Sequence, residues 1–180
     1  MRLFVAIPLA AKGIDELSAI SRRLKSGGDG LRWTAPATWH ITLQFLGETS
    51  RAQCECVVAS LHELHLPPVP IRLEGLGCFE RAGVFFAGVK VSPELVLLEE
   101  CVVAATALCG FAAETRPFQP HITLARSKGQ RQSLGELKTK ISRQPEFTRF
   151  TAGEFLLIES FLGPGGSRYE VRARFPLNSG

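Results

Sequence analysis

His40-Ile41-Thr42-Leu43 recurs without change as His121-Ile122-Thr123-Leu124 in the 180-residue chain, and this repeat is the main indication of its fold. A tetrapeptide match is improbable at any one position in a chain of this length, although two unrelated strands of similar composition remain an alternative explanation. We therefore expect a duplicated unit that carries one copy of the motif in each half.

Each copy of the motif has the composition of a β-strand. Side chains alternate along a strand, so His40 and Thr42 project from one face while Ile41 and Leu43 project from the other. The same alternation puts His121 and Thr123 on a shared face. If the two halves meet face to face, two imidazoles and two hydroxyls converge in one cleft.

Such a cleft suits the cleavage of a phosphodiester. Imidazole has an ordinary pKa of about 6.5, so one histidine can accept a proton from an attacking water while the other gives a proton to the departing oxygen. Threonine hydroxyls can donate hydrogen bonds to the non-bridging phosphate oxygens as negative charge builds up. The repeat thus predicts acid–base chemistry on phosphorus with Thr42 and Thr123 in support.

Together with its flanks, the pair of motifs resembles the two-histidine (2H) phosphoesterase superfamily, and within it the bacterial RNA 2′,3′-cyclic phosphodiesterases, also called 2′-5′ RNA ligases. The resemblance extends from end to end of the chain. It rests on Arg2-Leu3-Phe4-Val5-Ala6, Trp33, Trp39-His40-Ile41-Thr42-Leu43-Gln44-Phe45-Leu46-Gly47, Pro120-His121-Ile122-Thr123-Leu124-Ala125-Arg126, Glu159-Ser160 and Tyr169-Glu170-Val171.

The resemblance implies an α+β fold with two lobes related by a pseudo-twofold axis, in which two antiparallel sheets face a central cleft and helices pack outside. Residues 1–180 then form a single domain. The implied reaction is metal-independent and cofactor-free hydrolysis of RNA 2′,3′-cyclic phosphate ends to 2′-phosphomonoesters, with His40 as proton donor and His121 as proton acceptor. Internal symmetry leaves the reverse assignment open. ATP-independent 2′-5′ ligation and a non-catalytic nucleotide- or RNA-binding module are the alternative functions.

Five residues past each histidine the two copies differ, with Phe45 in one and Arg126 in the other. Both groups are planar, so we hypothesise that they hold a nucleobase between them, or that Arg126 holds phosphate. Odd offsets point away from the histidine face unless the strand ends or bulges first.

The chain departs from many relatives of this family just before residues 84–88. Gly83 stands where those relatives carry an arginine. Either Arg81 replaces the contact from nearby or a contact to phosphate or ribose is lost.

Periodicity and turn residues predict the remaining elements. Strands are expected at residues 2–7, 31–34, 40–46, 71–79, 84–90, 121–125, 150–161 and 169–177, and helices at 12–25, about 50–65, 93–109 and 133–141. A turn at residues 163–166 joins the last two strands.

Composition limits the class of protein further. The net charge of +4 and the pI near 9.0 suit a polyanionic substrate but fall short of a protein that coats nucleic acid. The apolar stretches are too short to span a membrane, and the N-terminal stretch is too short for a signal peptide. We expect a cytoplasmic monomer that binds RNA ends and no membrane.

The five cysteines are odd in number and lack paired spacing, so we expect reduced thiols. Cys54, Cys56, His62 and His65 superficially suggest a metal cluster. Residues two apart on a helix point about 200° apart, and we therefore predict no metal there.

Overall fold

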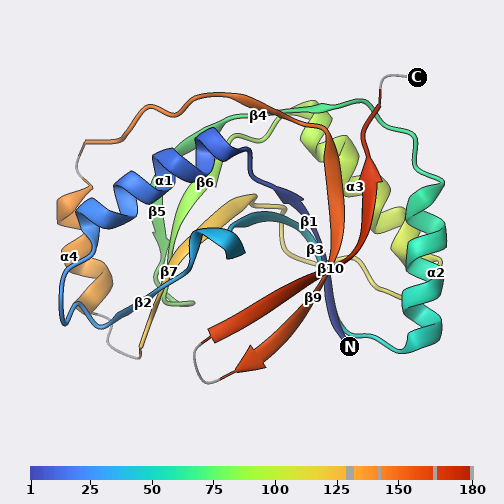
Figure 1. The fold of residues 1–180 in the computed structure, drawn as a ribbon, viewed down its shortest axis with the longest axis horizontal. Coiled ribbons are helices and arrows are strands. Elements are labelled where there is room, and N and C mark those ends of the chain that lie inside the picture. Colours follow the sequence, from blue (N-terminus) through green and yellow to red (C-terminus); the bar gives the residue numbers. More distant parts are fainter. Residues whose placement is uncertain (129–131, 142, 164–165, 179–180) are drawn as a thin grey trace.

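A computed structural model describes residues 1–128, 132–141, 143–163 and 166–178, and its main elements are two four-stranded antiparallel sheets (Figure 1). The first sheet has the order β10-β9-β1-β3. Its strands are β10 (Gly166–Pro176), β9 (Glu154–Gly163), β1 (Arg2–Pro8) and β3 (His40–Glu48). The motif strand β3 thus forms one edge of this sheet.

The second sheet has the order β2-β7-β6-β5 and contains the other motif strand, β7. Its strands are β2 (Leu31–Trp33), β7 (His121–Ser127), β6 (Val84–Val89) and β5 (Leu73–Phe79). A two-stranded sheet of β4 (Val69–Ile71) and β8 (Phe150–Ala152) is a further element, which the sequence did not predict.

Figure 1 shows two helices on the side of each large sheet. Helices α1 (Ala11–Leu24) and α4 (Gln132–Lys140) lie beside the β5–β7 sheet, and α2 (Arg51–His62) and α3 (Pro93–Ala107) lie beside the β1–β3 sheet. A short 3₁₀ helix, η1 (Pro36–Thr38), precedes β3. Ser50 and Ser92 cap α2 and α3 through their hydroxyls.

The order of elements repeats along the chain. The first half contains β1, α1, β3 and α2 in this order, with β2 and η1 inserted between α1 and β3. The second half contains β6, α3, β7 and α4 in the corresponding order. In both halves the motif strand pairs antiparallel with the first strand, β3 with β1 and β7 with β6. The expected duplicated α+β fold with antiparallel sheets is confirmed.

Several expected boundaries differ from the structure. The strand predicted at residues 150–161 is split at Gly153 into β8 and β9, and the one predicted at 71–79 begins as β5 at Leu73, after β4 has ended. The helix predicted to reach residue 65 ends at His62. Pro164 and Gly165 of the predicted turn lie outside the described residues.

The large core joins the four helices to one face of each large sheet and includes Val5, Ile41, Phe85 and Ile122. A smaller cluster of Phe4, Ala6, Leu156 and Ile158, with Tyr169 against it, covers the opposite face of the first sheet. That opposite face carries the motif polar groups. No helix among the described residues is long and apolar enough to cross a membrane.

The expectation of five reduced thiols is wrong for one pair. Cys56 on α2 and Cys109, just beyond α3, form a disulfide with a Cα–Cα distance of 5.8 Å. The two residues are 53 positions apart, and they meet because α2 packs against α3. Spacing in the sequence carries no sign of this helix pairing. Cys54, Cys78 and Cys101 are free.

Candidate active site

The two motif strands contact each other although they belong to different sheets. His40, Thr42, His121 and Thr123 are each partly buried, while Ile41, Leu43, Ile122 and Leu124 are fully buried. The side chains therefore alternate between the two faces of the strand, as predicted, over the four residues of each motif. The polar groups face away from the large core.

Both motif strands contain a β-bulge at the same position of the repeat. On β3, Gln44 pairs with Val5 and Thr42 with Ala6, which leaves Leu43 as an extra residue. On β7, Ala125 pairs with Phe85 and Thr123 with Phe86, which leaves Leu124 as the extra residue. Each bulge puts two consecutive side chains on the buried side.

The bulges reverse the alternation for the residues that follow. Phe45 is 60% exposed and Arg126 is exposed, after two buried neighbours in each strand. The residue five positions after each histidine therefore lies on the same face as that histidine, although regular alternation would put it on the opposite face. The structure brings Phe45 and Arg126 to the face that carries the four motif polar groups.

Each motif histidine is anchored by a backbone carbonyl two residues earlier. The Nδ1 of His40 donates to the carbonyl of Thr38 at 2.7 Å, and the Nδ1 of His121 donates to that of Gln119 at 2.8 Å. A carbonyl can only accept, so the proton sits on Nδ1 in the neutral ring. Nε2 is then the nitrogen that gains and loses a proton in both histidines.

A hydrogen-bond chain connects the two motifs through Thr34, which lies between β2 and η1. The indole Nε1 of Trp39 donates to the Thr34 hydroxyl at 2.8 Å. That hydroxyl in turn lies 2.8 Å from the carbonyl of Thr123 and 2.9 Å from that of Leu124. The residue before His40 is thereby tied to the bulge of β7.

Aromatic rings surround the two histidines. Phe4 and Tyr169 lie 4.7 Å and 5.4 Å from the His40 ring, measured between centroids. Phe79 and Phe86 lie 4.9 Å and 5.5 Å from the His121 ring. The sequence alone does not identify these four residues as neighbours of the histidines, because the faces of β1, β5, β6 and β10 are known only once the order of the strands in the two sheets is known.

Burial lowers the pKa of His40 to about 4, because removal from water disfavours the charged imidazole. The hydrogen bond to the Thr38 carbonyl opposes this effect, and the charges of His121 and Arg126 add to it. His40 is therefore neutral at pH 7 in the free protein. The effect of Arg126 on this pKa indicates that its guanidinium lies near His40.

Gly83 lies in the turn between β5 and β6 with a φ of +64°, a backbone conformation that favours glycine. A Cβ at this position would stand 3.2 Å from the Cβ of Ser127. This geometry accounts for a glycine where an arginine was expected. Arg81, in the same turn, is exposed.

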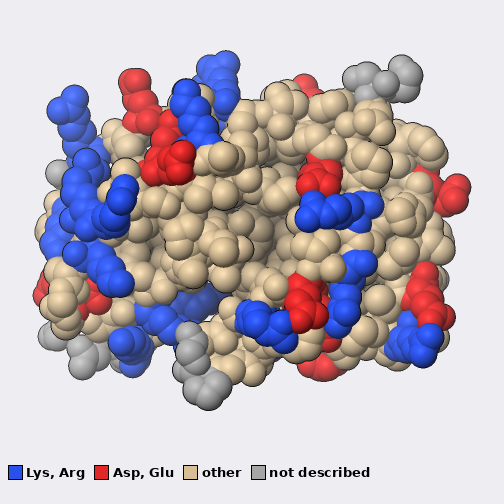
Figure 2. Space-filling model, in the orientation of Figure 1, with Lys and Arg blue, Asp and Glu red and all other residues tan. Residues whose placement is uncertain are grey.

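Charged side chains are unevenly distributed over the face seen in Figure 2. Lys and Arg gather on the side of α1 and α4, while the centre of this face is hollowed and mainly uncharged. Helix α1 contains Lys12, Arg22 and Arg23, and α4 contains Lys138 and Lys140. The protein thus presents a positively charged flank beside an uncharged hollow.

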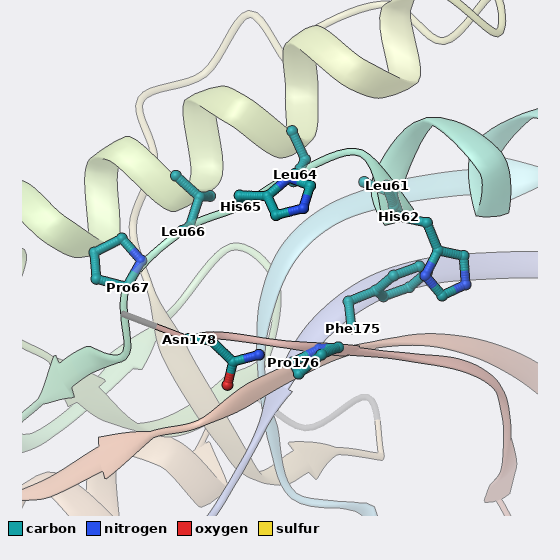
Figure 3. A pocket seen from close by; sticks show the side chains of 9 residues that line it. All are labelled: Leu61, His62, Leu64, His65, Leu66, Pro67, Phe175, Pro176 and Asn178. Carbon is teal, nitrogen blue, oxygen red and sulfur yellow. The ribbon is translucent and has the colours of Figure 1, made fainter. Parts of the chain in front are cut away.

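A pocket of about 340 Å³ lies away from the motif histidines, between the end of α2 and β10 (Figure 3). His62 packs there on Phe175 at 4.8 Å, and the Nδ1 of His65 donates to the carbonyl of Glu63. Cys56 is bonded to Cys109. Three of the residues that superficially suggest a metal cluster, Cys56, His62 and His65, thus have separate partners.

Comparison with known proteins places this site in a family. The model of the 2′-5′ RNA ligase superfamily matches residues 5–161. The RNA 2′,3′-cyclic phosphodiesterase of Archaeoglobus fulgidus is 31% identical over 94% of the chain and 97% of its own length. The protein of the same name from Aquifex aeolicus is 32% identical over 98% of the chain and 97% of its own length.

Solved structures agree with the sequence matches. Escherichia coli LigT in complex with 3′-AMP superposes with a TM-score of 0.83 at 27% identity, covering 99% of this chain and 98% of LigT. LigT in complex with NADP⁺ superposes with a TM-score of 0.81 at 28% identity over the same shares. These matches, together with the duplicated fold and the paired motifs, show that the chain belongs to the 2′-5′ RNA ligase superfamily of two-histidine phosphoesterases.

Proposed function

We propose that this enzyme hydrolyses RNA 2′,3′-cyclic phosphate ends to 2′-phosphomonoesters without a metal or other cofactor. Its relatives from Archaeoglobus fulgidus and Aquifex aeolicus bear the name RNA 2′,3′-cyclic phosphodiesterase. The substrates are RNA ends or nucleotides with a cyclic phosphate, and the enzyme acts as a monomer in the cytoplasm.

The observation that carries the proposal is the equivalent anchoring of the two imidazoles. In both His40 and His121 a carbonyl holds the proton on Nδ1 and leaves Nε2 to titrate. The charge of His121 contributes to the lowered pKa of His40, which indicates that the two rings lie near each other. Two positioned imidazoles can transfer protons on opposite sides of one phosphorus atom.

In the proposed reaction the Nε2 of His121 takes a proton from water as the water oxygen bonds to phosphorus. The P–O3′ bond breaks, and the Nε2 of His40 gives its proton to O3′. The phosphate stays on O2′, which accounts for a 2′-phosphomonoester. The hydroxyls of Thr42 and Thr123 donate hydrogen bonds to the non-bridging oxygens.

His40 must acquire a proton before it can act as the donor, since it is neutral at pH 7 in the free protein. A cyclic phosphate carries a negative charge, and a nearby negative charge favours protonated imidazole. Substrate binding then raises the pKa of His40 and charges the ring. The proton donor is thus assembled only when the substrate is present.

The remaining site residues hold the substrate. Arg126 lies on the side of His40 and provides a guanidinium for phosphate or for stacking on a base. Phe45 is exposed on the same face and lies 6.0 Å from Phe4, which packs on His40. We assign these two groups to the nucleobase of the nucleotide that carries the cyclic phosphate.

The test is hydrolysis of adenosine 2′,3′-cyclic phosphate with and without EDTA. Turnover is expected to persist in EDTA, and His40→Ala and His121→Ala are each expected to reduce kcat by about 10²–10⁴-fold, the usual contribution of a general acid or base. His65→Ala, a change at an exposed histidine outside the cleft, serves as the matched control. Loss of activity in EDTA contradicts the metal-free reaction.

The reverse assignment of the histidines is the second candidate, and one observation favours it. A ring that is already neutral at pH 7, as His40 is, suits a proton acceptor. That assignment would move the leaving oxygen to His121. Analysis of the product as a 2′- or a 3′-phosphate, combined with single-turnover pH profiles of His40→Ala and His121→Ala, distinguishes the two assignments.

A further inference from the structure

Arg32 on β2 lies directly opposite Arg126 on β7 in the antiparallel pairing of these two strands. Directly opposite residues of such a pair project from the same face of the sheet, with Cβ atoms about 5 Å apart. Both arginines are exposed. Arg32 therefore projects from the face to which the bulge of β7 turns Arg126, which is the face of His121 and Thr123.

The two guanidinium groups lack a counter-charge. Within the ranges that the structure describes, neither of them takes part in an ion pair. The nearby carboxylate of Asp29 instead accepts hydrogen bonds from the indole of Trp33 at 2.8 Å and from the backbone N–H of Leu31 at 3.0 Å. Like charges directly opposite each other in a sheet are destabilising. A pair of exposed arginines without counter-charges suits an anionic ligand.

Positive charge continues from these arginines away from the histidines. Lys128 is exposed directly after β7, and its backbone N–H donates to the carbonyl of Gly30 at 2.9 Å. Gly30 belongs to the loop between α1 and β2, and in the same loop the hydroxyl of Ser26 lies 3.4 Å from the ammonium of Lys140 on α4. The segment that carries Arg32 thus connects the cleft to the positively charged flank of α1 and α4 (Figure 2).

The proposed substrate has a second charged group that no residue discussed so far contacts. In an RNA chain, the nucleotide with the cyclic phosphate also carries a negatively charged phosphodiester on its O5′. The motif residues are assigned to the cyclic phosphate, and Phe45 and Arg126 to the nucleobase. Arginine binds phosphate strongly, because its planar guanidinium can donate two parallel hydrogen bonds. Arg32, one strand away from Arg126, offers such a group to the next charge along the chain.

We infer that Arg32 binds the phosphodiester on the 5′ side of the nucleotide that carries the cyclic phosphate. The inference rests on the proposed function and extends it, because this contact makes the enzyme favour the ends of RNA chains over cyclic mononucleotides, which have no such group. No bond forms or breaks at Arg32. Loss of the contact therefore raises KM and leaves kcat unchanged.

The test compares three substrates. These are adenosine 2′,3′-cyclic phosphate, the 3′-5′-linked dinucleotide adenylyl-adenosine with a 2′,3′-cyclic phosphate end, and the same dinucleotide with a methylphosphonate linkage, which keeps the length and removes the charge. Arg32→Ala is compared with the wild type on each of them. The matched control is Arg72→Ala, a change at an exposed arginine next to β5, which forms the opposite edge of the same sheet.

Arg32→Ala is expected to raise KM for the phosphate-linked dinucleotide by about 10–100-fold, the loss of hydrogen bonds to a charged group. Its KM for the other two substrates, its kcat and all constants of Arg72→Ala are expected to stay near wild type. The wild type itself is expected to show a lower KM for the phosphate-linked dinucleotide than for the methylphosphonate, which tests the contact without any substitution.

Two results would overturn the inference. One is a wild type that does not distinguish the two dinucleotides. The other is an Arg32→Ala enzyme whose KM is unchanged, or rises equally for all three substrates, since an equal rise would assign Arg32 to the surroundings of the cyclic phosphate. A wild type that hydrolyses none of the three would instead contradict the proposed function.

Discussion

The hydroxyl of Thr34 lies 2.8 Å from the backbone carbonyl of Thr123, although 89 positions separate the two residues in the chain. The same hydroxyl accepts a hydrogen bond from the indole of Trp39, the residue before His40. The side chain of Thr34 thus links Trp39, which precedes the first motif, to Thr123 in the second motif. We therefore expect this link to help set the distance between the two histidines.

Thr34→Val keeps the shape of the side chain and removes both hydrogen bonds. We expect kcat for cyclic phosphate hydrolysis to fall by about 10–100-fold, because small displacements of positioned groups are costly in the transition state. KM is expected to change little, since the substrate contacts remain. Steady-state kinetics check this, with Thr34→Ser expected to restore kcat and Thr139→Val, at an exposed position of α4, as the control. Equal losses in Thr34→Val and Thr34→Ser would contradict the link.

Phe45→Ala and Arg126→Ala are expected to raise KM for a dinucleotide ending in a cyclic phosphate, by about 5–100-fold where a stacked base loses its partner. Arg126→Ala should also raise the pKa of His40, because a nearby positive charge is removed. The control is Leu162→Ala, another change at a strongly exposed apolar residue. If both site variants leave KM unchanged, the assignment of the two residues to the nucleobase is wrong.

The low pKa of His40 predicts a loss of stability in acid. The folded protein binds this proton at about pH 4 and the unfolded chain at about 6.5, so the unfolded state takes up more protons as pH falls between these values. The free energy of unfolding should fall by roughly 3 kcal/mol from this group between pH 7 and pH 4. Urea unfolding of the wild type and of His40→Gln at pH 7 and pH 4 measures this fall in the free energy of unfolding, which we expect to be smaller in His40→Gln.

Titration of the His40 ring by NMR gives an independent check of the proposed proton supply. In the free protein the apparent pKa should lie near 4. Saturation with a 2′-nucleotide should raise it, since the bound phosphate places negative charge beside the ring. An unchanged His40 titration in the presence of bound nucleotide would favour the reverse assignment of the histidines.

The Cys56–Cys109 disulfide connects two helices outside the motif strands, so its reduction should affect stability more than catalysis. Closing a loop of this length contributes about 4 kcal/mol in the chain-entropy model. We expect the reduced enzyme, or Cys56→Ser, to unfold at a lower urea concentration with kcat near wild type. Thiol counting under native and reducing conditions provides the control. A large loss of kcat on reduction would show that the helix pair supports the site.

The sequence by itself determined which residues are candidates for the chemistry of the site. The repeat of His40-Ile41-Thr42-Leu43 at His121-Ile122-Thr123-Leu124 contains the groups to which we assign proton transfer, and the alternation of a strand is enough to put histidine and threonine on one face. Local patterns also predicted most helices and strands. These features depend only on neighbours in the chain.

Only the tertiary structure decided how the two motifs meet and what surrounds them. The bulges at Leu43 and Leu124, which turn Phe45 and Arg126 toward the histidine face, exist only in the register of β3 with β1 and of β7 with β6. The pairing of Cys56 with Cys109 and the contact of Phe79 with His121 likewise join residues far apart in sequence. Such contacts form because packing the core brings separate segments together, and no local pattern encodes that neighbourhood.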